Sequence, residues 1–83
     1  MSYHVSYEIG FLDLAAGFMK DDPAGIAELL ITLDLLEADP KPKTSFPYGS
    51  TGIRRLRADR YRVLYAIDEG SGTIRVDHLA RVP

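Results

Sequence analysis

Side chains alternate between two faces in the segment RYRVLYAI, residues 60–67. Its odd-numbered positions are all apolar and rich in aromatic and β-branched side chains, whereas its even-numbered positions begin with two arginines and end with leucine and alanine. A period of two with this composition indicates a β-strand. We therefore expect residues 60–67 to lie in the middle of a sheet and to carry positive charge where the strand begins.

Three other segments show the same period and predict further strands. Residues 2–9 alternate around one apolar face and end at Gly10, residues 53–57 form a short candidate, and residues 73–79 place Ile74 and Val76 on the inward face. The glycine-bearing segment 68–72 predicts a hairpin loop between the last two strands.

Apolar residues at helical spacing predict two helices between the first two strands. Residues 11–20 place apolar side chains three and four positions apart, which predicts a short helix. Asp22 and Pro23 form a start signal, an N-cap followed by proline at the first helical position, for a second helix over residues 23–38. Residues 39–52 hold three prolines and two glycines and therefore predict a loop.

The predicted order is β-α-α-β-β-β, an α+β fold in a single domain spanning residues 1–83. We expect one antiparallel sheet, with the helical hairpin packed on one face and the first strand antiparallel to the last strand at its edge. The other face remains open and carries the arginines. The expected core contains Phe18, Leu29, Leu33, Val63, Tyr65 and Val76.

Composition narrows the classes of function. The 83 residues include no cysteine, which excludes disulfides and thiolate metal sites, and no motif for a metal, nucleotide or redox cofactor is visible, so we expect no cofactor. Neither a signal peptide nor a membrane span is evident, and we expect a cytoplasmic protein. Residues 1–40 carry one basic and eight acidic residues, a net −7, whereas residues 41–83 carry nine basic and four acidic residues, a net +5.

Five arginines fall within the nine residues 54–62, namely Arg54, Arg55, Arg57, Arg60 and Arg62. One interpretation is a solvated surface that pairs with the acidic half of the chain. The other is a site for phosphate or carboxylate, because the guanidinium fork binds these anions through two hydrogen bonds. Lys41 and Lys43 either extend this basic surface or are ordinary solvated loop residues, and Tyr48 either stacks on a base or packs against the protein.

The segment GIRRLRADRYRVLYAID (residues 52–68), the tail VDHLARVP (residues 76–83) and the predicted element order resemble the RelE/ParE superfamily of toxins from bacterial type II toxin–antitoxin systems. The resemblance is strongest over residues 52–68, and the helices match only in length and pattern. It implies a RelE-like fold and a cognate antitoxin as partner in a hetero-oligomer. RelE-like members are implied to cut mRNA in the ribosomal A site, and ParE-like members to bind DNA gyrase.

The resemblance also suggests catalytic residues. Arg62 matches the arginine of the family's Tyr-Arg pair, and Arg55 matches the basic position on the preceding strand, with Arg54, Arg57 and Arg60 as further RNA-binding candidates. The family tail commonly reads VGHRREVY. An alignment without gaps then places Leu79 at the family's arginine and Pro83 at its tyrosine, so Leu79→Arg is expected to increase activity. Arg81 falls two residues later, on the same face as Leu79, and is a candidate substitute.

RNA cleavage by the 2′-hydroxyl requires removal of a proton, protonation of the leaving oxygen and neutralisation of a phosphorane. Arg55, Arg62 and Arg81 are candidates for the last task, and His78 for proton transfer, because imidazole changes charge near neutral pH. The leading hypothesis is a ribosome-dependent mRNA endonuclease. The alternatives are a non-enzymatic toxin that binds gyrase and an inactive antitoxin-binding or repressor subunit.

Overall fold

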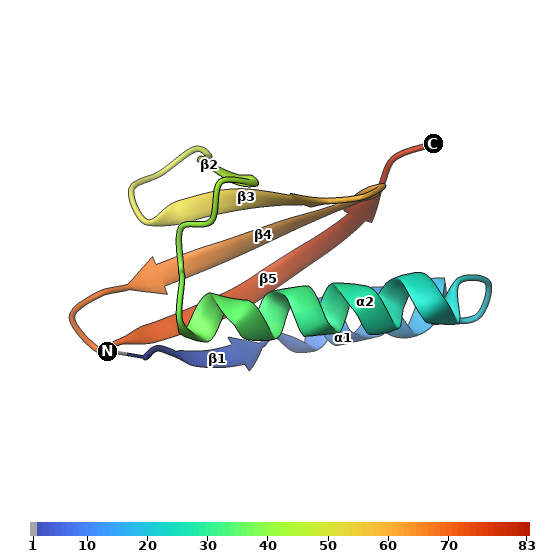
Figure 1. Ribbon diagram of the computed structural model, residues 1–83, viewed down its shortest axis with the longest axis horizontal. Coiled ribbons are helices and arrows are strands. Elements are labelled where there is room, and N and C mark those ends of the chain that lie inside the picture. Colours follow the sequence, from blue (N-terminus) through green and yellow to red (C-terminus); the bar gives the residue numbers. More distant parts are fainter. Residues whose placement is uncertain (1) are drawn as a thin grey trace.

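The structure, a computed structural model, describes residues 2–83 as two helices and a five-stranded sheet (Figure 1). The α+β class and the segments expected to form helices and strands are confirmed. Along the chain the elements are β1 (His4–Tyr7), α1 (Ile9–Met19), α2 (Pro23–Asp34), the short 3₁₀ helix η1 (Leu35–Glu37), β2 (Ser45–Pro47), β3 (Ile53–Ala58), β4 (Tyr61–Asp68) and β5 (Thr73–Arg81). No helix within residues 2–83 is long and apolar enough to cross a bilayer.

The sheet has the strand order β1-β5-β4-β3-β2, so the RYRVLYAI strand is central, as predicted. Strands β3, β4 and β5 form an antiparallel meander, but β1 pairs with β5 in parallel. The expected antiparallel pairing of β1 was therefore wrong. The reason is that the helical hairpin returns the chain to the start of β1, where the backbone N–H of Tyr3 donates to the oxygen of Glu37 at 2.8 Å, so β3 runs in the same direction as β1 (Figure 1). The segment expected to be only a loop also contains β2, a short strand that pairs antiparallel with β3.

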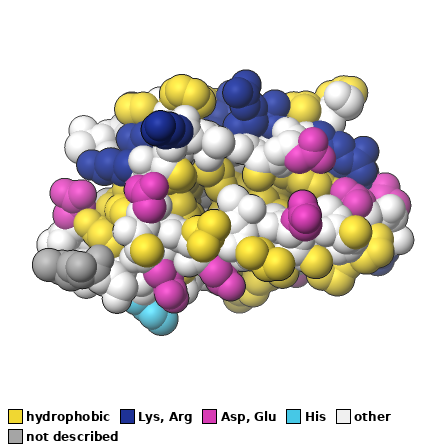
Figure 2. All heavy atoms as spheres, viewed as in Figure 1, with side chains coloured by type: hydrophobic (Ala, Val, Ile, Leu, Met, Phe, Trp, Pro, Cys, Tyr) yellow, Lys and Arg dark blue, Asp and Glu magenta, His cyan; other side chains and the backbone are white. Residues whose placement is uncertain are grey.

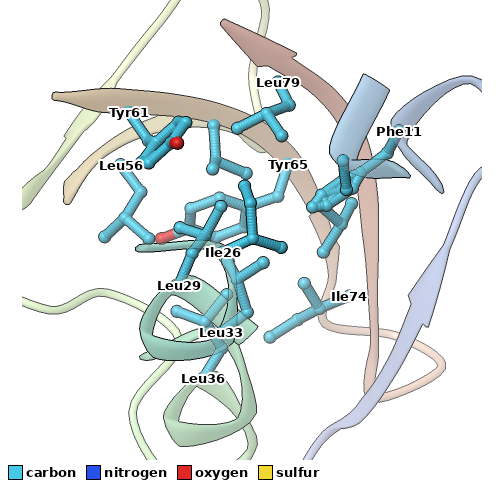
Figure 3. Close-up of a cluster of buried hydrophobic side chains, with 13 residues drawn as sticks. Phe11, Ile26, Leu29, Leu33, Leu36, Leu56, Tyr61, Tyr65, Ile74 and Leu79 are labelled. Atoms are coloured by element: carbon cyan, nitrogen blue, oxygen red, sulfur yellow. The ribbon is translucent and has the colours of Figure 1, made fainter. Parts of the chain in front are cut away.

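Both helices pack on one face of the sheet and enclose a single core (Figure 3). The expected core residues Leu29, Leu33, Val63, Tyr65 and Val76 are buried, and Phe18 is partly buried against them. The second helix begins as the sequence indicated, because the Asp22 carboxylate accepts a hydrogen bond of 3.1 Å from the backbone N–H of Gly25. The remaining core side chains are Phe11, Ala15, Ile26, Leu36, Leu56, Tyr61, Ile74 and Leu79.

A β-bulge interrupts the pairing of β4 with β5. Leu64 lies opposite His78, whereas the next residue, Tyr65, lies opposite Val76, so Asp77 is an extra residue in β5. Strict alternation would place His78 on the inward face with Val76, and Leu79 on the open face. The extra residue reverses this parity, so Leu79 is buried in the core and His78 is exposed on the opposite face.

Candidate nucleic-acid interface

The sheet face opposite the helices, which we call the open face, gathers the basic residues of the meander. Arg57 on β3 lies opposite Arg62 on β4, and Arg55 lies opposite Leu64. On the other side of β4, Ala80 lies opposite Arg62 and His78 lies opposite Leu64. His78 is thus a diagonal neighbour of Arg62. The structure therefore brings together four of the residues singled out from the sequence: Arg55, Arg57, Arg62 and His78.

The guanidinium group of Arg62 is held by the turn between β3 and β4. Its Nη1 donates hydrogen bonds to the backbone oxygens of Asp59, at 2.8 Å, and Tyr61, at 2.9 Å. Asp59 has a φ of 55°, a left-handed conformation that aspartate tolerates better than most residues. The turn therefore fixes the guanidinium, while its Nε and Nη2 make no hydrogen bond within residues 2–83 and remain available to a ligand.

A shallow hollow of about 330 Å³ lies beside these arginines. It is lined by Phe46, Arg55, Arg57, Arg62 and Val82. Phe46 on β2 lies opposite Arg55, and the Arg55 guanidinium carbon lies 5.7 Å from the ring centroid of Tyr48, a cation–π contact. Sequence reasoning missed Phe46, because a three-residue strand among prolines has too little alternation to be recognised.

Several other basic candidates lie away from the open face. Arg54 points to the opposite side of β3 and donates from Nε to Ser45 Oγ at 2.9 Å. Arg60 pairs with Asp22 at 3.1 Å, Lys41 lies 3.6 Å from Glu69, and Lys43 is exposed in the loop before β2.

Arg81, a candidate for charge neutralisation, lies on the helix-covered side of the sheet. It shares this side with the buried Leu79, as expected from their spacing, and so it does not join Arg55 and Arg62. Its guanidinium donates two hydrogen bonds to the Asp21 carboxylate, at 2.9 and 3.1 Å, and lies 4.5 Å from the ring centroid of Phe18. These contacts indicate that Arg81 connects β5 to the end of α1.

The pKa values reflect the ion pairs that Arg81 and Arg60 form on the helix-covered side of the sheet. The hydrogen bond from Arg81 lowers the pKa of Asp21, and the hydrogen bonds from Tyr61 and then Arg60 lower the pKa of Asp22. The bond to Asp21 likewise raises the pKa of Arg81. These ion pairs neutralise charge at the helix side.

No carboxylate oxygen within residues 2–83 lies within 4.0 Å of a guanidinium nitrogen of Arg55, Arg57 or Arg62. Figure 2 shows the same separation at the scale of the molecule, with Lys and Arg gathered mainly over the β2–β3 side and Asp and Glu mainly over the helices. The open face is therefore a positively charged surface whose arginines are free to bind phosphate. Within residues 2–83 no group of three or more His, Cys, Asp or Glu side chains is placed to hold a metal ion.

The fold is that of RelE-type toxins. No family model and no curated protein sequence matches this chain. Among solved structures, the RelBE2 toxin–antitoxin complex from Mycobacterium tuberculosis matches with a TM-score of 0.82 at 20% identity, covering 99% of this chain and 100% of that one. The archaeal RelE–RelB complex from Pyrococcus horikoshii matches with a TM-score of 0.83 at 24% identity, covering 98% and 96%.

A third solved structure with this fold is described as a different toxin. The YoeB/ParE toxin from Agrobacterium tumefaciens has a TM-score of 0.76 at 10% identity, covering 96% of this chain and 99% of that one. The predicted RelE-like fold is thus confirmed. Because proteins described as RelE and as YoeB/ParE share it, the fold alone does not select between the targets of these toxins.

Proposed function

We propose that this chain is the toxin of a type II toxin–antitoxin system and acts as a ribosome-dependent mRNA endonuclease in the cytoplasm. The observation that carries the proposal is the set of three arginines, Arg55, Arg57 and Arg62, on one uncovered sheet face without carboxylate partners within residues 2–83. The RelE fold supports the same class of protein.

The geometry supports a role for each of these groups in the proposed reaction. The fixed guanidinium of Arg62 stabilises the phosphorane charge, because a donor held in place before the reaction costs no reorganisation in the transition state. Arg55 and Arg57 bind flanking phosphates, and His78 transfers a proton. The face is shallow, so the ribosome supplies the alignment of the 2′-hydroxyl, the phosphate and the leaving oxygen.

Primer extension on programmed ribosomes tests this proposal. Arg62→Ala should abolish A-site cuts, and His78→Ala should reduce the cleavage rate by a factor of about 10² to 10⁴, the usual effect of losing a general acid or base. Arg75→Ala is the matched control, because Arg75 pairs with Asp77 at 2.6 Å at the far end of β5 and should not affect cleavage. Arg81→Ala should also leave cleavage intact, since Arg81 lies on the other side of the sheet.

Binding of DNA gyrase is the second candidate function. It is favoured by one observation: Leu79 and Pro83 stand at the two tail positions where the resemblance expects an arginine and a tyrosine, and Leu79 is buried, which leaves His78 as the one imidazole beside Arg62 within residues 2–83. A protein that blocks gyrase by binding needs no acid or base. If the unmodified protein makes no ribosomal cuts but inhibits gyrase in a supercoiling assay, this function replaces the first. If it does neither, it is an inactive antitoxin-binding subunit.

The proposed partner is a cognate antitoxin. The matched RelBE2 and RelE–RelB structures are toxin–antitoxin complexes, and the unpaired arginines of this chain are suited to a segment rich in Asp or Glu. Such a segment should cover the hairpin of residues 54–62, raise the melting temperature and bind more weakly as salt increases. Calorimetry that finds salt-independent binding, unchanged by Arg55→Ala with Arg62→Ala, would exclude the electrostatic contact.

A further inference from the structure

Phe46 is an exposed aromatic residue on an edge strand. Its side chain is 56% exposed although it is fully apolar, and Tyr48, two residues along the same strand direction, is 49% exposed. Phe46 lies opposite Arg55 and lines the hollow that also contains Arg57 and Arg62. An apolar ring therefore lies directly beside three cations that have no carboxylate partner within residues 2–83.

The strand that carries Phe46 is firmly attached to the sheet. The adjacent Ser45 is 4% exposed, and its Oγ and backbone oxygen accept hydrogen bonds of 2.9 and 3.0 Å from the Arg54 guanidinium. The backbone N–H of Arg57 donates to the oxygen of Thr44 at 2.9 Å, and that of Tyr48 donates to the oxygen of Ile53 at 3.0 Å. The position of Phe46 relative to the arginines is thus fixed before any ligand binds.

We infer that Phe46 is the stacking platform for an unpaired nucleobase, and that the neighbouring arginines bind the phosphates on either side of it. The inference rests on the proposed function and deepens it, because it names single-stranded RNA as the form of the substrate. Single-stranded nucleic acid is bound by the combination found here, aromatic faces for the bases and guanidinium groups for the backbone.

The dimensions of the site agree with this ligand. Neighbouring strands lie about 4.8 Å apart, so Phe46 on β2 and the arginines on β3 are within reach of a single nucleotide. The hollow of about 330 Å³ is at the lower end of the range of about 300–1,000 Å³ for small-ligand sites. A base paired in a duplex cannot lie flat on the ring, which makes the site selective for unpaired RNA.

Fluorescence polarisation with two RNAs isolates the stacking contribution. One probe is a fluorescein-labelled RNA of ten nucleotides, and the other is its abasic counterpart with the same sugars and phosphates. The protein should bind the base-bearing RNA more tightly, and Phe46→Ala should weaken that binding about tenfold while leaving abasic RNA unaffected. Phe46→Trp should retain the preference, whereas Arg57→Thr should weaken both RNAs equally because it removes a phosphate contact.

Equal affinity of the wild-type protein for the two RNAs would overturn the inference, as would an equal loss on both in Phe46→Ala. An effect of Phe46→Ala on antitoxin affinity alone would also overturn it and assign the residue to a protein contact. Because Phe46 is exposed, its substitution should not change the melting temperature; Phe46→Leu serves as a second variant if it does. Primer extension distinguishes a failure of this inference from a failure of the proposed nuclease function. If the protein cuts mRNA on ribosomes but does not prefer the base-bearing RNA, the nuclease function stands and the stacking role of Phe46 is rejected. If it prefers the base-bearing RNA but makes no cuts, the stacking role stands and the nuclease function is rejected.

Discussion

Arg57 and Arg62 lie directly opposite each other across the β3–β4 ladder, with no carboxylate oxygen within residues 2–83 close enough to pair with either. Like charges at opposite positions of adjacent strands destabilise a sheet. The chain could remove this repulsion by a single substitution at either position. An anion bound between the two guanidinium groups would relieve it instead, so the pair is understandable as part of a phosphate site.

Arg57→Thr should therefore stabilise the free protein while impairing its function. Removing the repulsion should raise the free energy of unfolding by about 0.5 kcal/mol, which for a domain of this size raises the melting temperature by about 2–4 °C. Thermal unfolding at low salt measures the gain, and it should shrink in 1 M salt, where the Debye length falls to about 3 Å.

Arg55→Thr is the matched control for this change. It makes the same replacement on the same strand and face, but Arg55 lies opposite Leu64 and Phe46 rather than another cation. Any gain due only to the β-propensity of threonine should appear in both variants. If Arg55→Thr stabilises as much as Arg57→Thr does, the repulsion between Arg57 and Arg62 is not the cause.

Leu79→Arg and Ala80→Arg should have opposite effects. Leu79 is 1% exposed in the core, so an arginine there buries an unpaired charge and should cost several kcal/mol of stability rather than increase activity, contrary to the expectation from the ungapped tail. Ala80 lies on the open face opposite Arg62, so an arginine there should cost only about 0.5 kcal/mol through repulsion from Arg62 and should bind one more phosphate. Urea unfolding and RNA titration measure the two outcomes; the salt dependence of log K for Ala80→Arg should steepen by about 0.7.

The ion pair of Asp21 with Arg81 should contribute to stability above the pH range in which carboxylates ordinarily titrate. The hydrogen bond from Arg81 lowers the pKa of Asp21 in the folded state. A lowered pKa stabilises the fold above the unfolded value of about 3.9, and this contribution is lost as the pH falls through the folded value. Asp21→Asn should therefore melt earlier than the wild type at pH 7, and the two melting curves should converge towards pH 2.

Asp13→Asn provides the comparison for this pH dependence, because Asp13 is exposed on α1 and has no ion pair within residues 2–83. Its melting temperature should follow that of the wild type throughout. A difference for Asp21→Asn that persists unchanged at pH 2 would show that the carboxylate charge is not what stabilises this end of the helix.

Ser45→Ala should loosen the strand that carries Phe46. The Ser45 hydroxyl donates to the oxygen of Pro42 at 2.9 Å and accepts from Arg54, so its loss leaves Arg54 Nε without this partner, while the Pro42 oxygen keeps the bond from the Ser45 backbone N–H. The expected cost is about 1–3 kcal/mol, measurable by urea unfolding. Hydrogen exchange should show faster exchange at the Arg57 amide, which donates to Thr44, while amides in the β4–β5 pairing change only by the global loss of stability.

The sequence was most informative where regular alternation coincides with burial. The RYRVLYAI strand shows its core face in every second residue, and Val63 and Tyr65 are both fully buried as expected. The start of α2 was equally predictable, because the capping aspartate and the proline that follows act within one turn of the chain. Arg55, Arg57 and Arg62 reached the same face because the turn between β3 and β4 is short and keeps their parity.

What could not be predicted depends on contacts between distant residues. The three residues of β2 become a strand only by pairing with β3, and the parallel pairing of β1 with β5 follows from the return of the helical hairpin to Tyr3 at the start of β1. The partner of Arg81 is Asp21, sixty residues away, and no local pattern indicates their contact. Phe46 appeared to be one aromatic residue in a proline-rich loop until the pairing placed it opposite Arg55.

The bulge at Asp77 shifts the relation between residue number and sheet face in β5. Every side chain after it lies on the face opposite to the one that strict alternation from Val76 predicts. The tail must therefore be compared with that of other chains by face and not by position. Deleting Asp77 would remove the bulge and leave His78 on the open face and Leu79 in the core, whereas regular pairing with Asp77 retained would expose Leu79 and turn His78 towards the core. The bulged pairing around one residue thus decides whether the last strand offers an imidazole or a leucine to whatever the open face binds.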